Sequence, residues 1–209
     1  MLAYTCYSAL ASGPLCSPKM IRVLETRPVM RTIEIVAIPE YAISAEECSQ
    51  LEILLDQCFP NTFAGRTYFK QLPHFRLLAL DEGSVVAQVG IDARVVTVGG
   101  TTVSILGLID TAVHPARRGQ RIATRLLAEA ERIARAGQRD FLVLMADRHD
   151  LYLKAGYHRV QPAPTKWLAI EDRQSAELMT RDLSDCFMAK PLTEKGWPAG
   201  TIDMLGYVF

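Results

Sequence analysis

The chain has 209 residues, 49% of them hydrophobic, which is enough to bury the core of one domain. Its 23 basic and 23 acidic side chains cancel, so the overall charge gives no reason to expect nucleic acid or an anionic membrane as a partner. No apolar stretch approaches the roughly 20 residues that span a bilayer, and five cysteines without paired spacing predict reduced thiols, no metal and a cytoplasmic protein.

Residues 1–30 are mildly apolar and rich in small residues, like a targeting peptide. They carry no basic start, and Ser12-Gly13-Pro14 interrupts the apolar part, which argues against a secretory signal. Met20 and Met30 precede the first clear strand pattern. We expect a flexible extension here and a single domain over residues 31–209.

The first part of that domain has a strand pattern and a helix pattern. Residues 32–38 are rich in β-branched side chains and predict a strand. Ser44 and Glu47 have the spacing of a capping box, and the apolar side chains that follow predict a helix over residues 45–58. Residues 59–73 contain scattered proline and glycine, which predicts a loop or a short helix.

Three strand patterns then follow closely, at residues 75–80, 85–96 and 101–113. Gly99-Gly100 can supply the positive φ angles of a tight hairpin, so these strands are expected to form an antiparallel meander. Residues 122–136 place apolar side chains on one helical face, and Gly137 ends that helix.

The remaining elements are shorter. Residues 141–145 are nearly all apolar, as in a strand buried on both faces. A short helix is expected at residues 148–155, and further strands at residues 157–160, 166–170 and 186–190. The order predicts a mixed α/β (α+β) domain: a mostly antiparallel central sheet, one βαβ crossover and helices on both faces. Ligands of such sheets bind beyond the carboxyl ends of diverging strands.

Two motifs frame that crossover. Residues 113–123 read Val-His-Pro-Ala-Arg-Arg-Gly-Gln-Arg-Ile-Ala, and residues 151–157 read Leu-Tyr-Leu-Lys-Ala-Gly-Tyr. Together they resemble the GNAT superfamily of acyl-CoA-dependent N-acyltransferases. The first resembles the Arg/Gln-x-x-Gly-x-Gly/Ala pyrophosphate loop, with Arg118 and Ala123 at its ends, and the second resembles a Leu-Tyr-x-x-x-Gly-Phe segment. The resemblance covers residues 31–160 and implies acetyl-CoA, or another acyl-CoA, as co-substrate.

A helix start suits a pyrophosphate, because its first N–H groups lack intrahelical acceptors and its dipole is positive. Backbone groups near Ala112 and Val113 would orient the pantetheine in the family manner. The expected acyl-CoA-binding residues are therefore Ala112, Val113, Arg117, Arg118, Gly119, Gln120, Arg121, Ile122, Ala123 and Thr124. The alternative is a solvated basic helix start, which the positive dipole would disfavour without an anion.

The chain departs from the family motif at Arg121, which replaces the central glycine, so its side chain must turn away from the phosphates or reach round to them. The aminoglycoside 2′-acetyltransferases resemble this chain in an Arg-Gly-Gln-Arg run at the same place. We therefore expect the loop to tolerate Arg121.

The resemblance places Tyr152 at the family's general acid, whereas a packing tyrosine is the alternative. Many members carry a glutamate base where this chain has Ile109. Asp110 is adjacent, but consecutive strand residues face opposite sides, so it can act as the base only if a β-bulge turns it inward. A water relay, His114 and Asp203 are the other candidates.

The tail motif Trp-Pro-Ala-Gly at residues 197–200 resembles the tail of the nodulation acyltransferase NodA and, loosely, that of the aminoglycoside 2′-acetyltransferases. Both act on amino sugars. This resemblance implies C-terminal strands that border the acceptor site, with Trp197 and Asp203 as substrate-binding residues. The alternative for Trp197 is a core anchor at a turn.

These patterns together predict an N-acetyltransferase that transfers acetyl from acetyl-CoA to the primary amine of a small molecule or amino sugar by direct attack. A peptide or protein N-acetyltransferase and a non-catalytic acyl-CoA-binding module are the alternatives. The expected partner is a small-molecule amine, without nucleic acid or membrane, and the expected assembly is a monomer or homodimer.

Overall fold

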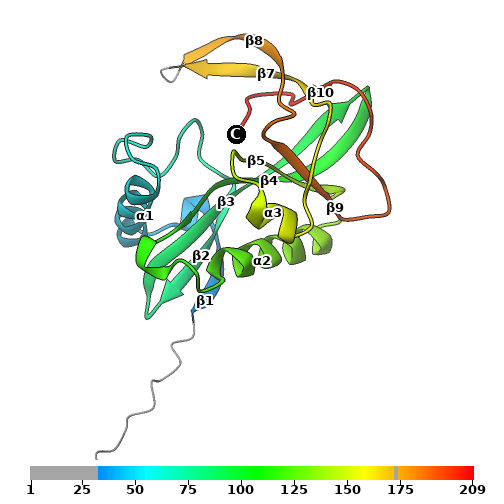
Figure 1. The fold of residues 1–209 in the computed structure, drawn as a ribbon. Helices are drawn as coiled ribbons and strands as arrows, with labels where there is room; N and C mark the ends of the chain where they lie inside the picture. The colour runs from blue at the N-terminus through cyan, green and yellow to red at the C-terminus, as the bar shows by residue number, and fades with distance from the viewer. Residues whose placement is uncertain (1–32, 172–173) are drawn as a thin grey trace, which may run out of the picture. The chain divides into compact units, whose positions relative to one another are not determined.

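The computed structural model describes residues 33–171 and 174–209 (Figure 1). The predicted extension, residues 1–30, lies outside the described residues. The helices are η1 Glu40–Ala42, α1 Ala45–Cys58, η2 Pro115–Arg117, α2 Ile122–Ala136 and α3 Asp150–Lys154. The strands are β1 Glu34–Pro39, β2 Phe75–Asp81, β3 Ser84–Val98, β4 Thr101–Val113, β5 Phe141–Met145, β6 His158–Arg159, β7 Pro164–Glu171, β8 Gln174–Asp182, β9 Phe187–Pro191 and β10 Ile202–Asp203.

In the described part of the chain, ten strands form one sheet with the order β6-β9-β5-β4-β3-β10-β7-β8, and β2 and then β1 extend it from β3. Adjacent strands are antiparallel except for β4 with β5 and β10 with β7. The crossover runs from β4 through α2 to β5. The predicted mixed, mostly antiparallel sheet with one βαβ crossover is thus confirmed.

The two long helices cover opposite faces of the sheet, as consecutive residues of β2 make clear. Leu77 packs with the apolar face of α2, and Leu78 packs with that of α1. The predicted capping box at the start of α1 is confirmed: Ser44 Oγ accepts from the Glu47 N–H at 3.2 Å, and the Glu47 carboxylate accepts from the Ser44 N–H at 2.8 Å.

Some elements differ from their prediction. The predicted helix over residues 148–155 is shorter, as α3, and the predicted strand over residues 157–160 is reduced to β6. β8 was not predicted, because eight of its nine side chains are exposed and none is buried. A strand without a buried face has no alternation of apolar and polar residues, so only its pairing with β7 identifies β8 as a strand.

The tail after β9 is anchored by close packing. Trp197 packs edge-on against Phe141 and Phe187, with ring centroids 4.9 and 5.5 Å apart. A Cβ atom on Gly200 would lie 2.6 Å from the Gly99 Cα atom, so this contact requires glycine. These contacts guide the tail into β10, which pairs with β3 on one side and with β7 on the other.

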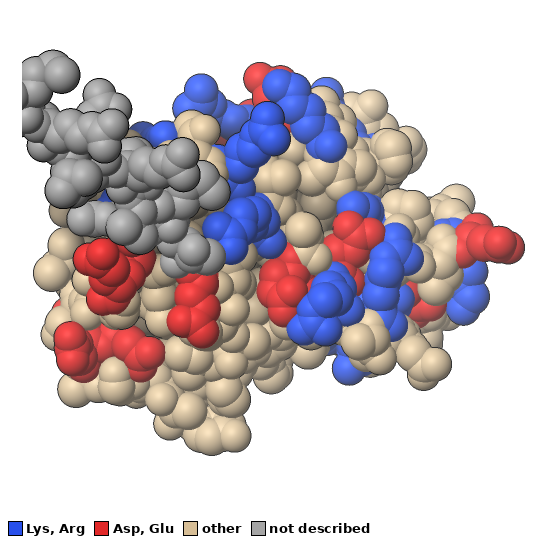
Figure 2. Space-filling view, turned by 90° about the horizontal axis from the view of Figure 1, so that it is seen from below, with Lys and Arg blue, Asp and Glu red and all other residues tan. Residues whose placement is uncertain are grey.

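Opposite charges meet on the face seen in Figure 2, where basic and acidic side chains lie beside one another. On α2, Arg132 pairs with Glu129 at 2.7 Å and Arg135 pairs with Glu131 at 2.7 Å.

Among the described residues, none of the helices has both the length and the apolar content needed to cross a membrane.

Candidate functional site

β4 and β5 separate partway along their length. They pair from Ile105 with Phe141 to Leu108 with Leu144, and β4 then continues alone on this side to Val113. Beyond the last pair a cleft of about 580 Å³ opens along β4, and we call it the β4–β5 cleft. Such a divergence between neighbouring strands is where α/β sheets bind ligands.

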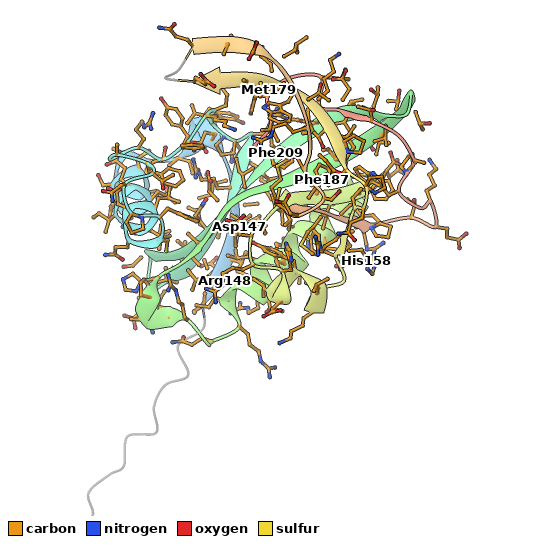
Figure 3. The ribbon with its side chains drawn as sticks, turned by 45° about the horizontal axis from the view of Figure 1, so that its top comes forward. Asp147, Arg148, His158, Met179, Phe187 and Phe209 are labelled. Carbon is orange, nitrogen blue, oxygen red and sulfur yellow. The ribbon has the colours of Figure 1, made fainter. Side chains whose placement is uncertain are left out.

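The β4–β5 cleft collects residues from five parts of the chain. β4 provides one wall, and α3 with the loop before it provides the other; Figure 3 labels Asp147 and Arg148 in that loop. The end of α1, the basic turn and the start of α2 complete it. The lining residues are Cys58, Phe59, Thr111, Ala112, Val113, Arg118, Ala123, Arg148, Asp150, Leu151 and Tyr152.

Tyr152 reaches the β4–β5 cleft from α3, and its ring is held by a buried neighbour. The Tyr157 ring packs against it at a centroid distance of 5.9 Å with an interplanar angle of 76°. Gly156, with a φ of 86°, makes the turn that brings Tyr157 back beneath the helix. Burial raises the pKa of Tyr152, and a hydrogen bond from Thr111 opposes that rise. At neutral pH the hydroxyl therefore keeps its proton and can donate it.

Asp110 lies in a β-bulge, the condition under which it can act as a base. Gln88 of β3 faces Ala112 and Gly90 faces Ile109, so β4 has two residues where β3 has one. Asp110 has a φ of 50°, in the left-handed region. Burial raises its pKa from 3.8 to about 6, and the charges of Arg76 and Lys70 oppose this rise. A carboxyl group with this pKa is largely ionised at pH 7 and can accept a proton.

Buried polar side chains support this bulge. Gln88 is fully buried and donates a hydrogen bond from its amide to the Asp110 carbonyl. Its amide oxygen accepts from Arg76 at 3.0 Å, and Arg76 in turn holds both carboxylate oxygens of Glu40, at 2.8 and 3.0 Å. Arg76, 1% exposed, also donates to the Thr67 carbonyl. The bulge is thus tied to β2, η1 and the loop after α1.

The basic turn before α2 has the backbone of an anion-binding loop. Gly119 has a φ of 79°, and Arg121, the residue before α2, has φ 59° and ψ 20°. Arg121 thus adopts the left-handed conformation usual for glycine, at the position where the family motif has one. α2 has neither a side-chain cap nor an acidic residue in its first turn. Its first N–H groups therefore remain available to an anion.

Arg117 and Arg118 of this turn make different contacts. Arg117 pairs with Asp81, which is 5% exposed, so its guanidinium holds the turn against the end of β2. Arg118 is exposed, and its Nε donates to the Val113 carbonyl at 3.2 Å.

Beside the β4–β5 cleft lies a hollow of about 280 Å³ lined by Val113, Arg117, Arg118, Gly119, Arg121, Ile122, Ala123, Thr124 and Leu151. Of the expected loop residues, Gln120 alone lines neither space.

The structure does not bring Trp197 and Asp203 to the β4–β5 cleft. Asp203 of β10 faces Thr97 near the far end of β3, where it pairs with Lys166 at 3.1 Å. Trp197 lines a separate hollow of about 490 Å³ beside β6 and β9. None of the residues that line that hollow belongs to a helix, so it lacks the helix start that suits a pyrophosphate, and we place the candidate site in the β4–β5 cleft instead.

The other candidates for the base have different roles. His114 accepts a hydrogen bond from the Ala116 N–H at 3.2 Å through Nδ1 and so caps η2. The Ile109 side chain covers Gly90: a Cβ atom there would lie 2.7 Å from Ile109 Cγ1. Among the residues proposed from the sequence as bases, Asp110 is the one in the bulge. It directly precedes Thr111, which lines the β4–β5 cleft, but is not itself one of the lining residues.

Sequence reasoning missed Thr111, Cys58, Gln88 and Arg76 as parts of the site. Thr111 and Cys58 line the β4–β5 cleft, whereas Gln88 and Arg76 lie behind the bulge. A signal existed for Arg76 and Gln88, since both are polar residues within predicted strands that are otherwise largely apolar. Buried polar groups of this kind need partners and are seldom present without a role.

Comparison with known proteins agrees with this geometry. A family profile described as Acetyltransferase (GNAT) domain matches residues 42–160, which include α1, the β2–β5 strands, α2 and α3. No curated protein matches the sequence.

Solved structures share the fold. A GNAT family N-acetyltransferase (YhbS) from Escherichia coli in complex with CoA is 18% identical, with a TM-score of 0.63, and the match covers 86% of this chain and 92% of that one. A GNAT family acetyltransferase from Brucella melitensis in complex with acetyl-CoA is 16% identical, with a TM-score of 0.53 over 81% and 94%. ElaA from Escherichia coli is 16% identical, with a TM-score of 0.52 over 76% and 99%.

Proposed function

The chain belongs to the GNAT acetyltransferase family, and from this premise we propose that it transfers the acetyl group of acetyl-CoA to the primary amine of a small molecule. The observation that carries the proposal is the arrangement at the β4–β5 cleft. Tyr152 reaches it from α3, and beside it the bulge of β4 turns Asp110 out of the strand alternation. The proposal makes Tyr152 the acid and Asp110 the base. Thr111, which hydrogen-bonds to Tyr152, directly follows Asp110 on β4.

The residues proposed to hold acetyl-CoA follow the course of the cleft. The first N–H groups of α2, together with Gly119 and Arg118, suit the pyrophosphate, because they combine unpaired donors, a positive dipole and a charge. The backbone of Ala112 and Val113 lies along the cleft wall, where the pantetheine would run. Arg117 shapes the turn through Asp81 and is assigned a positioning role.

In the proposed reaction acetyl-CoA supplies an acetyl thioester. Asp110 accepts a proton from the amine as the nitrogen bonds to the acetyl carbon. Tyr152 gives its proton to the sulfur as the carbon–sulfur bond breaks, and this neutralises the departing thiolate. The raised pKa values of both groups suit these roles, since Asp110 holds a proton better than an ordinary aspartate and Tyr152 remains protonated.

Release of free thiol from acetyl-CoA, measured across a panel of small amines, amino sugars and peptides, tests the proposal. We expect turnover with small amines and a product heavier by one acetyl group. Turnover restricted to peptides would identify a peptide N-acetyltransferase instead. Tight CoA binding without turnover on any amine would leave a non-catalytic acyl-CoA-binding module and overturn the enzymatic assignment.

A further inference from the structure

Lys70 carries a half-buried ammonium group with few partners. Its Nζ donates to the Val208 carbonyl at 3.2 Å and lies 5.8 Å from the centre of the Phe69 ring. Within the described part of the chain, no carboxylate lies within 4.0 Å of it. Burial lowers the pKa of Lys70, and the charge of Asp110 opposes this. A partly desolvated cation with one carbonyl as partner is costly unless an anion joins it.

Lys70 belongs to the same surface as Asp110. Pro73, at the end of its loop, packs over Gly90 together with Ile109, the neighbour of Asp110. Val208 precedes Phe209, whose ring covers Gly107 of β4, and Figure 3 labels Phe209 where the terminal segment crosses the sheet. Pro73 and Phe209 thus lie beside β4 near residues 109 and 107. We call the region of residues 66–73, residues 208–209 and Asp110 the acceptor surface.

Nearby charges on η1 and β3 are already neutralised. Glu40 is held by Arg76 in two hydrogen bonds. Asp92, 1% exposed, has Arg94 at 2.5 Å and His74 at 2.6 Å. Of the carboxylate side chains of Glu40, Asp92 and Asp110, that of Asp110 is the one without an ion pair. If Asp110 takes the proton from the amine, the unpaired charge that remains for the rest of the acceptor is the positive charge of Lys70.

The loop adds a second cation of the same sign. Arg66 donates to the Phe63 carbonyl at 2.8 Å and lies over the Tyr68 ring, 5.6 Å from its centre, and within the described residues it has no carboxylate partner. An acceptor with several ammonium groups would be repelled by Lys70 and Arg66. An acceptor with an anionic group would gain a charge-assisted hydrogen bond.

We propose that the acceptor is an amine that also bears a carboxylate, as an α-amino acid does, and that Lys70 binds this carboxylate while Asp110 takes the proton from the amine. The assignment rests on the proposed acetyltransferase function and narrows its substrate class. It places Lys70 as a specificity-determining residue, acting on affinity for the acceptor more than on the chemical step.

Matched amines test the assignment. Each α-amino acid is compared with the amine that lacks only the carboxylate, such as phenylalanine with 2-phenylethylamine and histidine with histamine. We expect kcat/KM for the amino acids to exceed that for the matched amines by about tenfold or more, as for a charged hydrogen bond. Preference for the decarboxylated amines or for polycationic amino sugars would overturn it.

Variants at Lys70 separate recognition from structure. Lys70→Met is expected to raise KM for the preferred amino acid by about tenfold or more and to change kcat/KM for its decarboxylated partner much less, while Lys70→Arg keeps the preference. The rates are compared well above the pKa of Asp110, because loss of the Lys70 charge raises that pKa. Lys195→Met, at an exposed pair with Asp140, is the matched control. Retained CoA binding shows that each variant is folded.

An equal loss on both members of a pair would mean that Lys70 is structural and would refute its role in recognition. Acetylation of many amines without regard to the carboxylate would refute the inference and leave the acetyltransferase function standing. Absence of thiol release with every amine would reject that function itself, and this inference with it.

Discussion

Gln88 donates a hydrogen bond from its buried side-chain amide to the backbone carbonyl of Asp110, at the bulge of β4. A bulge leaves backbone groups outside the regular ladder, and a buried carbonyl without a donor is costly. Gln88 removes that cost and is itself fixed by Arg76. The place of the proposed base therefore depends on buried side chains of neighbouring strands.

Gln88→Leu removes both hydrogen bonds at similar volume. The Asp110 carbonyl and an N–H of Arg76 would lose their partner, so we expect the free energy of unfolding to fall by about 1 to 3 kcal/mol. We also expect kcat to fall, because Asp110 is no longer fixed, while the affinity for CoA stays the same. Urea unfolding, steady-state kinetics and calorimetry measure the three quantities.

Gln50→Leu is the matched control for this variant. The Gln50 amide oxygen accepts a hydrogen bond from the Val85 N–H at 2.6 Å. Val85 is on β3, the strand of Gln88, but lies away from the bulge. Gln50→Leu should cost comparable stability and leave kcat unchanged. If both variants lowered kcat alike, the effect of Gln88 would reflect stability alone.

Asp110→Asn tests the base directly. We expect kcat/KM to fall by about 10²-fold to 10⁴-fold, as for loss of a general base. The wild-type rate should rise with pH through the pKa of about 6, and this limb should be absent from the variant. The pH profile is measured with an acceptor whose own amine titrates well outside that range. An unchanged limb near pH 6 would assign it to another group.

The same variant has an expected effect on stability. The pKa of Asp110 is about 6 in the folded protein against an ordinary 3.8, so folding favours the neutral acid. That contribution is fully present below pH 3.8 and is lost as pH rises through about 6. Asp110→Asn should therefore be the more stable protein at pH 8, by up to about 3 kcal/mol at about 1.4 kcal/mol per pH unit, and should lose this advantage near pH 4. Urea unfolding at both pH values measures the difference.

Local patterns predicted the elements that depend on local physics. The α1 capping box and the apolar face of α2 lie within one stretch of sequence, and both are observed with the predicted bounds. The bulge at Asp110 depends instead on the register between β3 and β4, which no single segment contains. Asp203 was expected at the acceptor site because the tail motif resembles the tails of acyltransferases that act on amino sugars. Its position depends instead on the pairing of β10 with β3 and β7, which the sequence of the tail does not contain.

Tyr152→Phe should lower kcat by about 10²-fold or more, because the departing thiolate loses its proton donor. The dissociation constant of CoA should stay the same. Tyr157→Phe is the control, since it keeps the ring that packs on Tyr152 and removes a buried hydroxyl without a hydrogen-bond partner among the described residues. That variant should be as active as the wild type. Equal rates for the wild type and Tyr152→Phe would exclude Tyr152 from the mechanism.

Arg118 and Arg121 are expected to differ in their effect on CoA binding. Arg118→Ala should raise the dissociation constant about tenfold, because a charged contact to phosphate is lost, and should leave KM for acetylpantetheine, which lacks the pyrophosphate, unchanged. In Arg121→Gly, the glycine adopts a φ of 59° more easily than arginine does and relieves about 1 kcal/mol of strain. Because the loop should keep its conformation, the dissociation constant of CoA should change less than about threefold. A larger loss at Arg121 would show that its charge contacts the phosphates.

Cys58 can report occupancy of the β4–β5 cleft. It lines the cleft, and its Sγ lies 3.9 Å from an Arg118 guanidinium nitrogen. Burial raises the pKa of Cys48 and of Cys186, which leaves less reactive thiolate at those two sites at neutral pH. N-ethylmaleimide should therefore label Cys58 faster than Cys48 and Cys186, and desulfo-CoA, which cannot consume the reagent, should slow Cys58 alone. Peptide mass spectrometry over a time course measures each rate. If all three rates slowed together, the ligand would be stabilising the fold as a whole, and if Cys58 were unaffected, the acyl-CoA would lie elsewhere.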